Sequence, residues 1–140
     1  MTEVVHHTGG CLCGAIRYEV LTPLAKLVHC HCTDCQRASG AGASANAVLP
    51  SAKLRLTQGE PKVFSKTVDS GNILHRSFCG DCGSPIHTRR DHTPEMTVLK
   101  VGSLDDSDHM AIALSIWMKS RRPWMPVDPD ADQLEGNRPS

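Results

Sequence analysis

The sequence predicts a single, mainly β domain built as a sandwich of sheets. At 140 residues the chain fits one domain of ordinary size. About eight short strand-like runs alternate with glycine, proline and asparagine turns, a pattern typical of β-sandwiches. We expect roughly one or two brief helices at most, so sheets must supply the core.

The predicted strands follow one another along most of the chain. Residues 15–20 alternate apolar and polar side chains, as a half-buried strand does. The strands that we expect cover residues 15–20, 24–28, 46–49, 53–57, 63–68, 73–78, 86–89 and 96–101. Residues 112–118 are apolar, but the run is too short to separate a strand from a helix. Residues 34–38 could form one helical turn, with Thr33 or Asp34 as its N-cap.

The two ends of the chain differ from its middle. We expect residues 1–7 to form a flexible N-terminal tail and residues 8–125 to form the domain. Residues 126–140 carry several prolines and acids, which predicts an extended or loose C-terminal tail. In the domain, an edge strand would allow a homodimer.

Charge and hydropathy exclude some classes of function. Fifteen Lys and Arg balance fifteen Asp and Glu, which argues against a nucleic-acid or anionic-membrane binder. No apolar run approaches the ~18 residues of a membrane span, and no signal-peptide pattern is visible. The seven cysteines are odd in number and closely spaced, which favours metal binding over a disulfide framework. We therefore expect a cytoplasmic protein with reduced thiols.

Four of the cysteines fit one closed metal site. Cys79-x-x-Cys82 followed by Gly83 is a zinc-knuckle half-site, whose backbone amides can point at the sulfurs and stabilise thiolate. A closed structural zinc needs four ligands, and Cys11 and Cys13 can supply the other two.

The remaining three cysteines lie in one short segment. Cys30, Cys32 and Cys35 form a Cys-x-Cys-x-x-Cys pattern, interleaved with His29 and His31. Three protein ligands with one open position are typical of a catalytic zinc. Alternating residues of an extended segment point to opposite faces, which groups the sulfurs apart from the imidazoles. The alternative is that a histidine closes the site, or that the site is empty.

Three stretches of the sequence together carry a family resemblance. These are GGCLCG at residues 9–14, HCHCTDCQ at residues 29–36 and FCGDCGS at residues 78–84. Their order and spacing resemble the glutathione-dependent formaldehyde-activating enzyme family, which also includes centromere protein V. The resemblance covers roughly residues 8–125 and implies a zinc-stapled coiled β-sandwich, similar to the fold of the mammalian suppressor of Sec4 (Mss4-like).

The resemblance also implies two zinc sites and a reaction. One structural zinc would match Cys11, Cys13, Cys79 and Cys82, and a second zinc would match Cys30, Cys32 and Cys35. In the namesake enzyme the second zinc is linked to condensing glutathione with formaldehyde into S-hydroxymethylglutathione.

The sequence therefore predicts a carbon–sulfur lyase or synthase that acts on a small thiol such as glutathione. Cys30, Cys32 and Cys35 would be its catalytic residues, holding the working metal. Two alternatives stay open at this point. The first is a non-enzymatic zinc module that binds a protein partner or stores metal. The second is a thiol redox sensor in which the three-cysteine cluster forms a disulfide.

Overall fold

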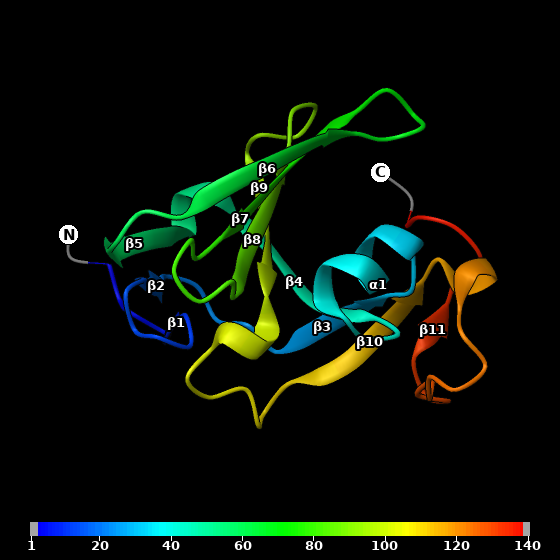
Figure 1. Ribbon diagram of the computed structural model, residues 1–140. Coiled ribbons are helices and arrows are strands. Elements are labelled where there is room, and N and C mark those ends of the chain that lie inside the picture. The colour runs from blue at the N-terminus through cyan, green and yellow to red at the C-terminus, as the bar shows by residue number, and fades with distance from the viewer. Residues whose placement is uncertain (1–2, 139–140) are drawn as a thin grey trace.

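The computed structural model describes residues 3–138 and consists of two sheets, one α-helix and three single-turn 3-10 helices within that range (Figure 1). The helices are α1 (Thr33–Ser39), η1 (Ser51–Lys53), η2 (Val101–Ser103) and η3 (Met118–Ser120). The strands are β1 (His7–Gly10), β2 (Arg17–Val20), β3 (Lys26–Cys30), β4 (Ser44–Pro50), β5 (Leu54–Gln58), β6 (Lys62–Thr67), β7 (Ile73–Phe78), β8 (Pro85–Arg90), β9 (Met96–Lys100), β10 (Ala111–Ile116) and β11 (Asp132–Gln133).

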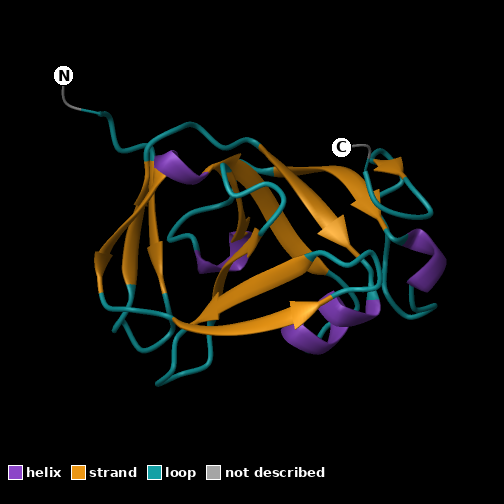
Figure 2. Cartoon of the chain, turned by 90° about the horizontal axis from the view of Figure 1, so that it is seen from above, coloured by secondary structure: helices purple, strands orange, loops and turns teal. Residues whose placement is uncertain are grey.

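The order of the strands in space differs from their order in the chain. The small sheet has the order β1-β2-β5, and the large sheet has the order β11-β10-β3-β4-β9-β8-β7-β6. In the large sheet β10 pairs in parallel with both β3 and β11, whereas the other pairs are antiparallel. Figure 2 shows the small sheet at one end of the molecule, beside the larger one. The mainly β, Mss4-like class is confirmed.

The main core lies between the two sheets. Tyr18 and Val20 of the small sheet are almost fully buried against Ala47, Leu49 and Leu99 of the large sheet. Alternation explains this, because β2 buries every second residue while the residues between them stay half-exposed. This core fixes the small sheet on one face of the large sheet.

A second, smaller core lies where α1 meets the large sheet. It comprises Cys30, Cys35 and Ile116, with Leu114 and Trp117 packed against them. Because Cys30 lies opposite Ile116 in the β3–β10 pair, both side chains project to the same face of the sheet. This face carries α1 and, with it, the cysteines of the helical segment.

Each predicted strand overlaps a strand of the structure, and the remaining elements compare as follows. β1 and β11 were not predicted; they are four and two residues long. The ambiguous run 112–118 is a strand, β10, which ends at Ile116. The N-cap of α1 is Cys32 rather than Thr33 or Asp34, because the Cys32 sulfur accepts the backbone N–H of Cys35 at 3.3 Å.

Both ends of the chain make backbone contacts with the sheets. The His6 N–H donates to the Val20 carbonyl at 2.8 Å, and the Leu134 N–H donates to the Ser115 carbonyl at 2.9 Å. Residues 1, 2, 139 and 140 of the two expected tails lie outside the described residues. Within residues 3–138, no helix combines the length and apolar character needed to cross a membrane.

Candidate metal centres

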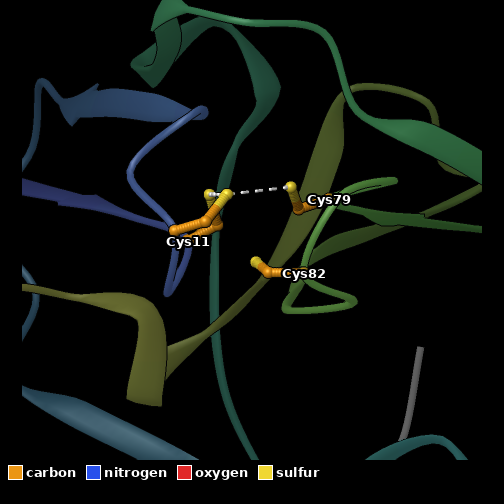
Figure 3. A group of neighbouring side chains, drawn as sticks. Cys11, Cys79 and Cys82 are labelled. Carbon is orange, nitrogen blue, oxygen red and sulfur yellow. Dashed lines mark hydrogen bonds between the residues drawn. The ribbon is translucent and has the colours of Figure 1, made fainter.

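The first cluster contains the sulfurs of Cys11, Cys13, Cys79 and Cys82, which all lie within 4.8 Å of one another. The Cys11 and Cys13 sulfurs are 3.6 Å apart, and those of Cys13 and Cys79 are 3.8 Å apart. Figure 3 shows the labelled Cys79 and Cys82 reaching toward Cys11 from the facing turn. Four convergent sulfurs are a donor set that suits a tetrahedral zinc ion.

Two similar turns present these sulfurs. In one, the Gly14 N–H donates to the Cys11 carbonyl, and in the other the Gly83 N–H donates to the Cys79 carbonyl. Gly14 and Gly83 have φ values of 82° and 81°, a conformation that favours glycine. The Leu12 N–H donates to the Ser84 hydroxyl at 3.0 Å and so joins the two turns directly.

Backbone and hydroxyl groups around this cluster stabilise thiolate. The Ile16 N–H donates to the Cys11 sulfur at 3.2 Å, and the Asp81 N–H donates to the Cys79 sulfur at 3.4 Å. Hydrogen bonding from the Ser84 side chain, together with its backbone, lowers the pKa of Cys82 to about 5. Because thiolate is the form that binds metal, these hydrogen bonds to the sulfurs favour the binding of a metal ion.

The second cluster contains the sulfurs of Cys30, Cys32 and Cys35, which also lie within 4.8 Å of one another. Cys30 ends β3, Cys32 caps α1 and Cys35 is in the first turn of that helix. Hydrogen bonding from Cys30 and Cys32 lowers the pKa of Cys35, which favours the thiolate form of this side chain. The three sulfurs together match the ligand preferences of zinc.

A chain of polar groups leads from the second cluster into the large sheet. Beyond the larger effects of Cys30 and Cys32, the Ser44 hydroxyl also contributes to lowering the pKa of Cys35. Asn46 Nδ2 donates to Ser44 Oγ at 2.9 Å, and Lys100 Nζ donates to Asn46 Oδ1 at 2.7 Å. Lys100 is partly buried, and burial lowers its pKa while the charge on Cys35 raises it. A cation is thereby held beside the sulfurs.

The structure brings all seven predicted cysteines into the two expected groups. The three-sulfur group contains no histidine nitrogen among the described residues. His31 is fully buried, and its two ring nitrogens have no hydrogen-bond partner within residues 3–138. Its ring centroid lies 6.2 Å from that of His29. Whether the sulfurs hold metal, and with how many ligands, stays a prediction.

The chain is therefore a mainly β protein with two cysteine clusters, each of which could hold a zinc ion. The model of the family described as "glutathione-dependent formaldehyde-activating enzyme" matches residues 6–120, so this chain belongs to that family. A crystal structure of a protein from Rhodobacter sphaeroides has a similar fold, with a TM-score of 0.59. The two chains are 26% identical, and the match covers 72% of this chain and 90% of the other.

Sequence reasoning missed two cationic residues near the second cluster, Arg76 and Lys100. They come from separate strands, and nothing in their local sequence pointed to a shared site. The arginine pairs at residues 89–90 and 121–122 stand out more in the sequence. However, Arg89 donates to the Thr97 hydroxyl and Arg122 donates to the Gln36 amide oxygen.

Proposed function

We propose that this protein makes or breaks the carbon–sulfur bond between a small thiol, such as glutathione, and formaldehyde or a similar small carbonyl compound. The site of the reaction would be the cluster of Cys30, Cys32 and Cys35. One observation carries the proposal: three sulfurs converge within 4.8 Å, and no fourth side-chain ligand belongs to their group in residues 3–138. Membership of a formaldehyde-activating family supports the choice of thiol and carbonyl.

The chemistry of the donor set suits this reaction. Cys30, Cys32 and Cys35 would hold the zinc ion, which when bound would favour the thiolate form of a substrate thiol or polarise a carbonyl oxygen. Cys30 and Cys35 are buried, and Cys32 is partly exposed. The protein can therefore hold the reacting groups together while limiting contact with water.

The reaction needs no oxidant or reductant. In the forward direction the substrate thiol gives up its proton and its sulfur adds to the carbonyl carbon. The carbon–oxygen π pair moves to the oxygen, which takes up one proton and becomes the hydroxyl of the hydroxymethyl thioether. The reverse sequence cleaves the same bond and returns the thiol and the aldehyde.

The proposal is tested with glutathione and ¹³C-labelled formaldehyde. Because the adduct also forms without an enzyme, the measured quantity is the acceleration of exchange between free aldehyde and adduct, followed by NMR. We expect acceleration by the wild type and none by Cys32→Ser. A Thr33→Ala variant, changed at the exposed neighbouring residue, is the matched control and should behave as the wild type does.

Zinc analysis of the same samples separates the alternatives. Two zinc ions per chain in the wild type, falling to about one in Cys32→Ser with the fold kept, would establish a separate second site. If the wild type holds two zinc ions but leaves the exchange rate unchanged, the enzyme proposal is wrong and a non-enzymatic zinc module is favoured. Full acceleration by Cys32→Ser would also contradict the assignment of the site.

A further inference from the structure

A hollow lies on the α1 side of the large sheet, and one residue of its wall, Ser44, lies opposite Cys30 of the second cluster in the β3–β4 pair. Its volume is about 210 Å³, and residues of α1, β4, β6, β7, β8 and β9 line it. Two cationic side chains, Arg76 and Lys100, are among the lining residues, and no Asp or Glu of the described chain is. The hollow is therefore unusual in having positive charge and no opposing carboxylate in its walls.

Strand register places both cations on one face of the sheet. Arg76 of β7 lies opposite Phe64 on one side and Thr88 on the other, and Thr88 lies opposite Val98 of β9. Residues directly opposite in antiparallel strands project to the same face, and so do residues two apart along a strand. Lys100 is two residues beyond Val98, so its side chain projects to the face of Arg76.

The same reasoning places the cysteine cluster on this face. Cys30 lies opposite Ser44 in the β3–β4 pair, and Asn46, two residues further, lies opposite Lys100 in the β4–β9 pair. Ser44 is also among the residues that line the hollow. The sulfurs and the cations thus lie along one surface of the sheet, with Ser44 between them.

The protein itself does not neutralise these two charges. Lys100 Nζ donates to a neutral amide oxygen, that of Asn46. Within residues 3–138, Arg76 has no ion pair. Asp34, the acidic residue in the first turn of α1, is already paired with Lys66 at 2.7 Å. Two like charges that share a partly buried hollow repel each other, and a bound anion would relieve that repulsion.

Arg76 also affects its neighbour directly. After burial, which has the largest effect, and the opposing charge of Cys35, the charge of Arg76 lowers the pKa of Lys100. Both cations also line the same hollow, so one anionic ligand bound there could contact them together. An arginine fork binds both oxygens of a carboxylate, and a lysine ammonium adds a point charge beside it.

We propose that Arg76 and Lys100 bind a carboxylate of the thiol substrate, so that this hollow selects anionic thiols over neutral ones of the same size. The inference rests on the function proposed above for the neighbouring cluster. A thiol that carries a carboxylate a few bonds from its sulfur would place the two groups at the two ends of this surface. The family's thiol, glutathione, carries carboxylates, and neutral thiols of similar length would lack this contact.

Two probes of equal size test the charge selection. 3-Mercaptopropionate carries a carboxylate, and 3-mercaptopropionamide carries a neutral amide in its place. Their binding to the zinc-loaded protein is measured by isothermal titration calorimetry. We expect the wild type to prefer the carboxylate by about tenfold or more, as is typical of a charge-assisted hydrogen bond. Arg76→Gln should lose most of this preference while its affinity for the amide and its zinc content stay unchanged.

Two further variants serve as controls. Arg76→Lys keeps the charge without the fork and should retain part of the preference. Arg55→Gln makes the same change in the small sheet, where Arg55 is an exposed partner of Glu19, and should keep the full preference. A wild type that binds the two probes equally, or binds neither, overturns the proposal. Equal loss of the preference in Arg76→Gln and Arg55→Gln also overturns it.

The condensation of glutathione with formaldehyde is followed separately on the same samples. If the wild type prefers the carboxylate probe but does not accelerate condensation, carboxylate binding in the hollow is supported and the proposed function is contradicted. If the wild type accelerates condensation without preferring the carboxylate probe, only carboxylate binding in the hollow is contradicted. The two proposals can therefore fail independently.

Discussion

Replacing Cys82 by serine tests whether the first cluster joins the two halves of the sandwich. The turn that carries Cys11 and Cys13 leads into the small sheet, whereas Cys79 and Cys82 lie on the turn between β7 and β8 of the large sheet. A metal ion on all four sulfurs would cross-link these turns. Removing one of the four ligands leaves the metal site incomplete, which should strongly weaken the cross-link.

The size of the effect follows from the length of chain that the cluster closes. Cys13 and Cys79 are 66 residues apart. In the chain-entropy treatment, a cross-link over such a loop stabilises the fold by roughly 4 kcal/mol at 25 °C. This is a large part of the ~5–15 kcal/mol typical of a whole domain. With an unfolding entropy of roughly 2.1 cal/mol/K per residue, the melting temperature of this chain should fall by roughly 14 °C.

Thermal unfolding followed by circular dichroism measures this shift, with and without a zinc chelator. The control is Cys32→Ser, which removes the same group from the second cluster. There the three cysteines are close in sequence and cross-link no distant segments, so the control should shift less than half as far. If Cys82→Ser melts within about 3 °C of the wild type, the shift expected for 1 kcal/mol in a chain of this length, the cross-link reasoning is wrong.

Three smaller perturbations test the packing and charge around β1 and β2. A Cβ at Gly9 would lie 2.5 Å from the Ser103 carbonyl and against the buried Tyr18 ring, so Gly9→Ala should cost about 1–3 kcal/mol in urea unfolding. Tyr18→Phe removes the 2.7 Å hydrogen bond to the Ser103 hydroxyl and should cost about 1 kcal/mol in the same assay; an unchanged midpoint would contradict this. Arg17 holds the pKa of Asp105 at about 2, below its ordinary 3.8. The ionised carboxylate therefore stabilises the fold above the unfolded pKa, and that contribution is lost as the pH falls through about 2. Asp105→Asn should be less stable than the wild type at neutral pH by a small, solvent-screened amount, and urea titrations should show the difference vanishing near pH 2.

Local patterns in the sequence were enough to predict most of the elements. Turn residues and alternation marked the strands from residue 15 to residue 101, because these signals act over a few neighbouring residues. β1 and β11 escaped prediction because they are only four and two residues long, too short to show a clear alternation of apolar and polar side chains. The cap of α1 was predicted wrongly because thiolates were not considered as acceptors for backbone N–H groups.

The number of ligands that a zinc site needs also predicted that the seven cysteines divide into a group of four and a group of three. Spacing alone grouped Cys30, Cys32 and Cys35, because they lie within one short segment. The four-sulfur group needed the further step of pairing two half-sites across ~65 residues, which rested on the four ligands that a closed zinc site requires. The structure brings the sulfurs into these same two groups.

The tertiary structure alone decided what surrounds the sulfurs. Arg76 and Lys100 share a hollow because β9 lies between β4 and β8 in the large sheet, an order that local sequence does not encode. The same order places Ser44 and Asn46 between Lys100 and the second cluster. The sequence by itself determined the fold class and the grouping of the cysteines that could hold metal, since these depend on local patterns and ligand chemistry. The surroundings of the site depend on contacts between distant strands, so only the folded chain could decide them.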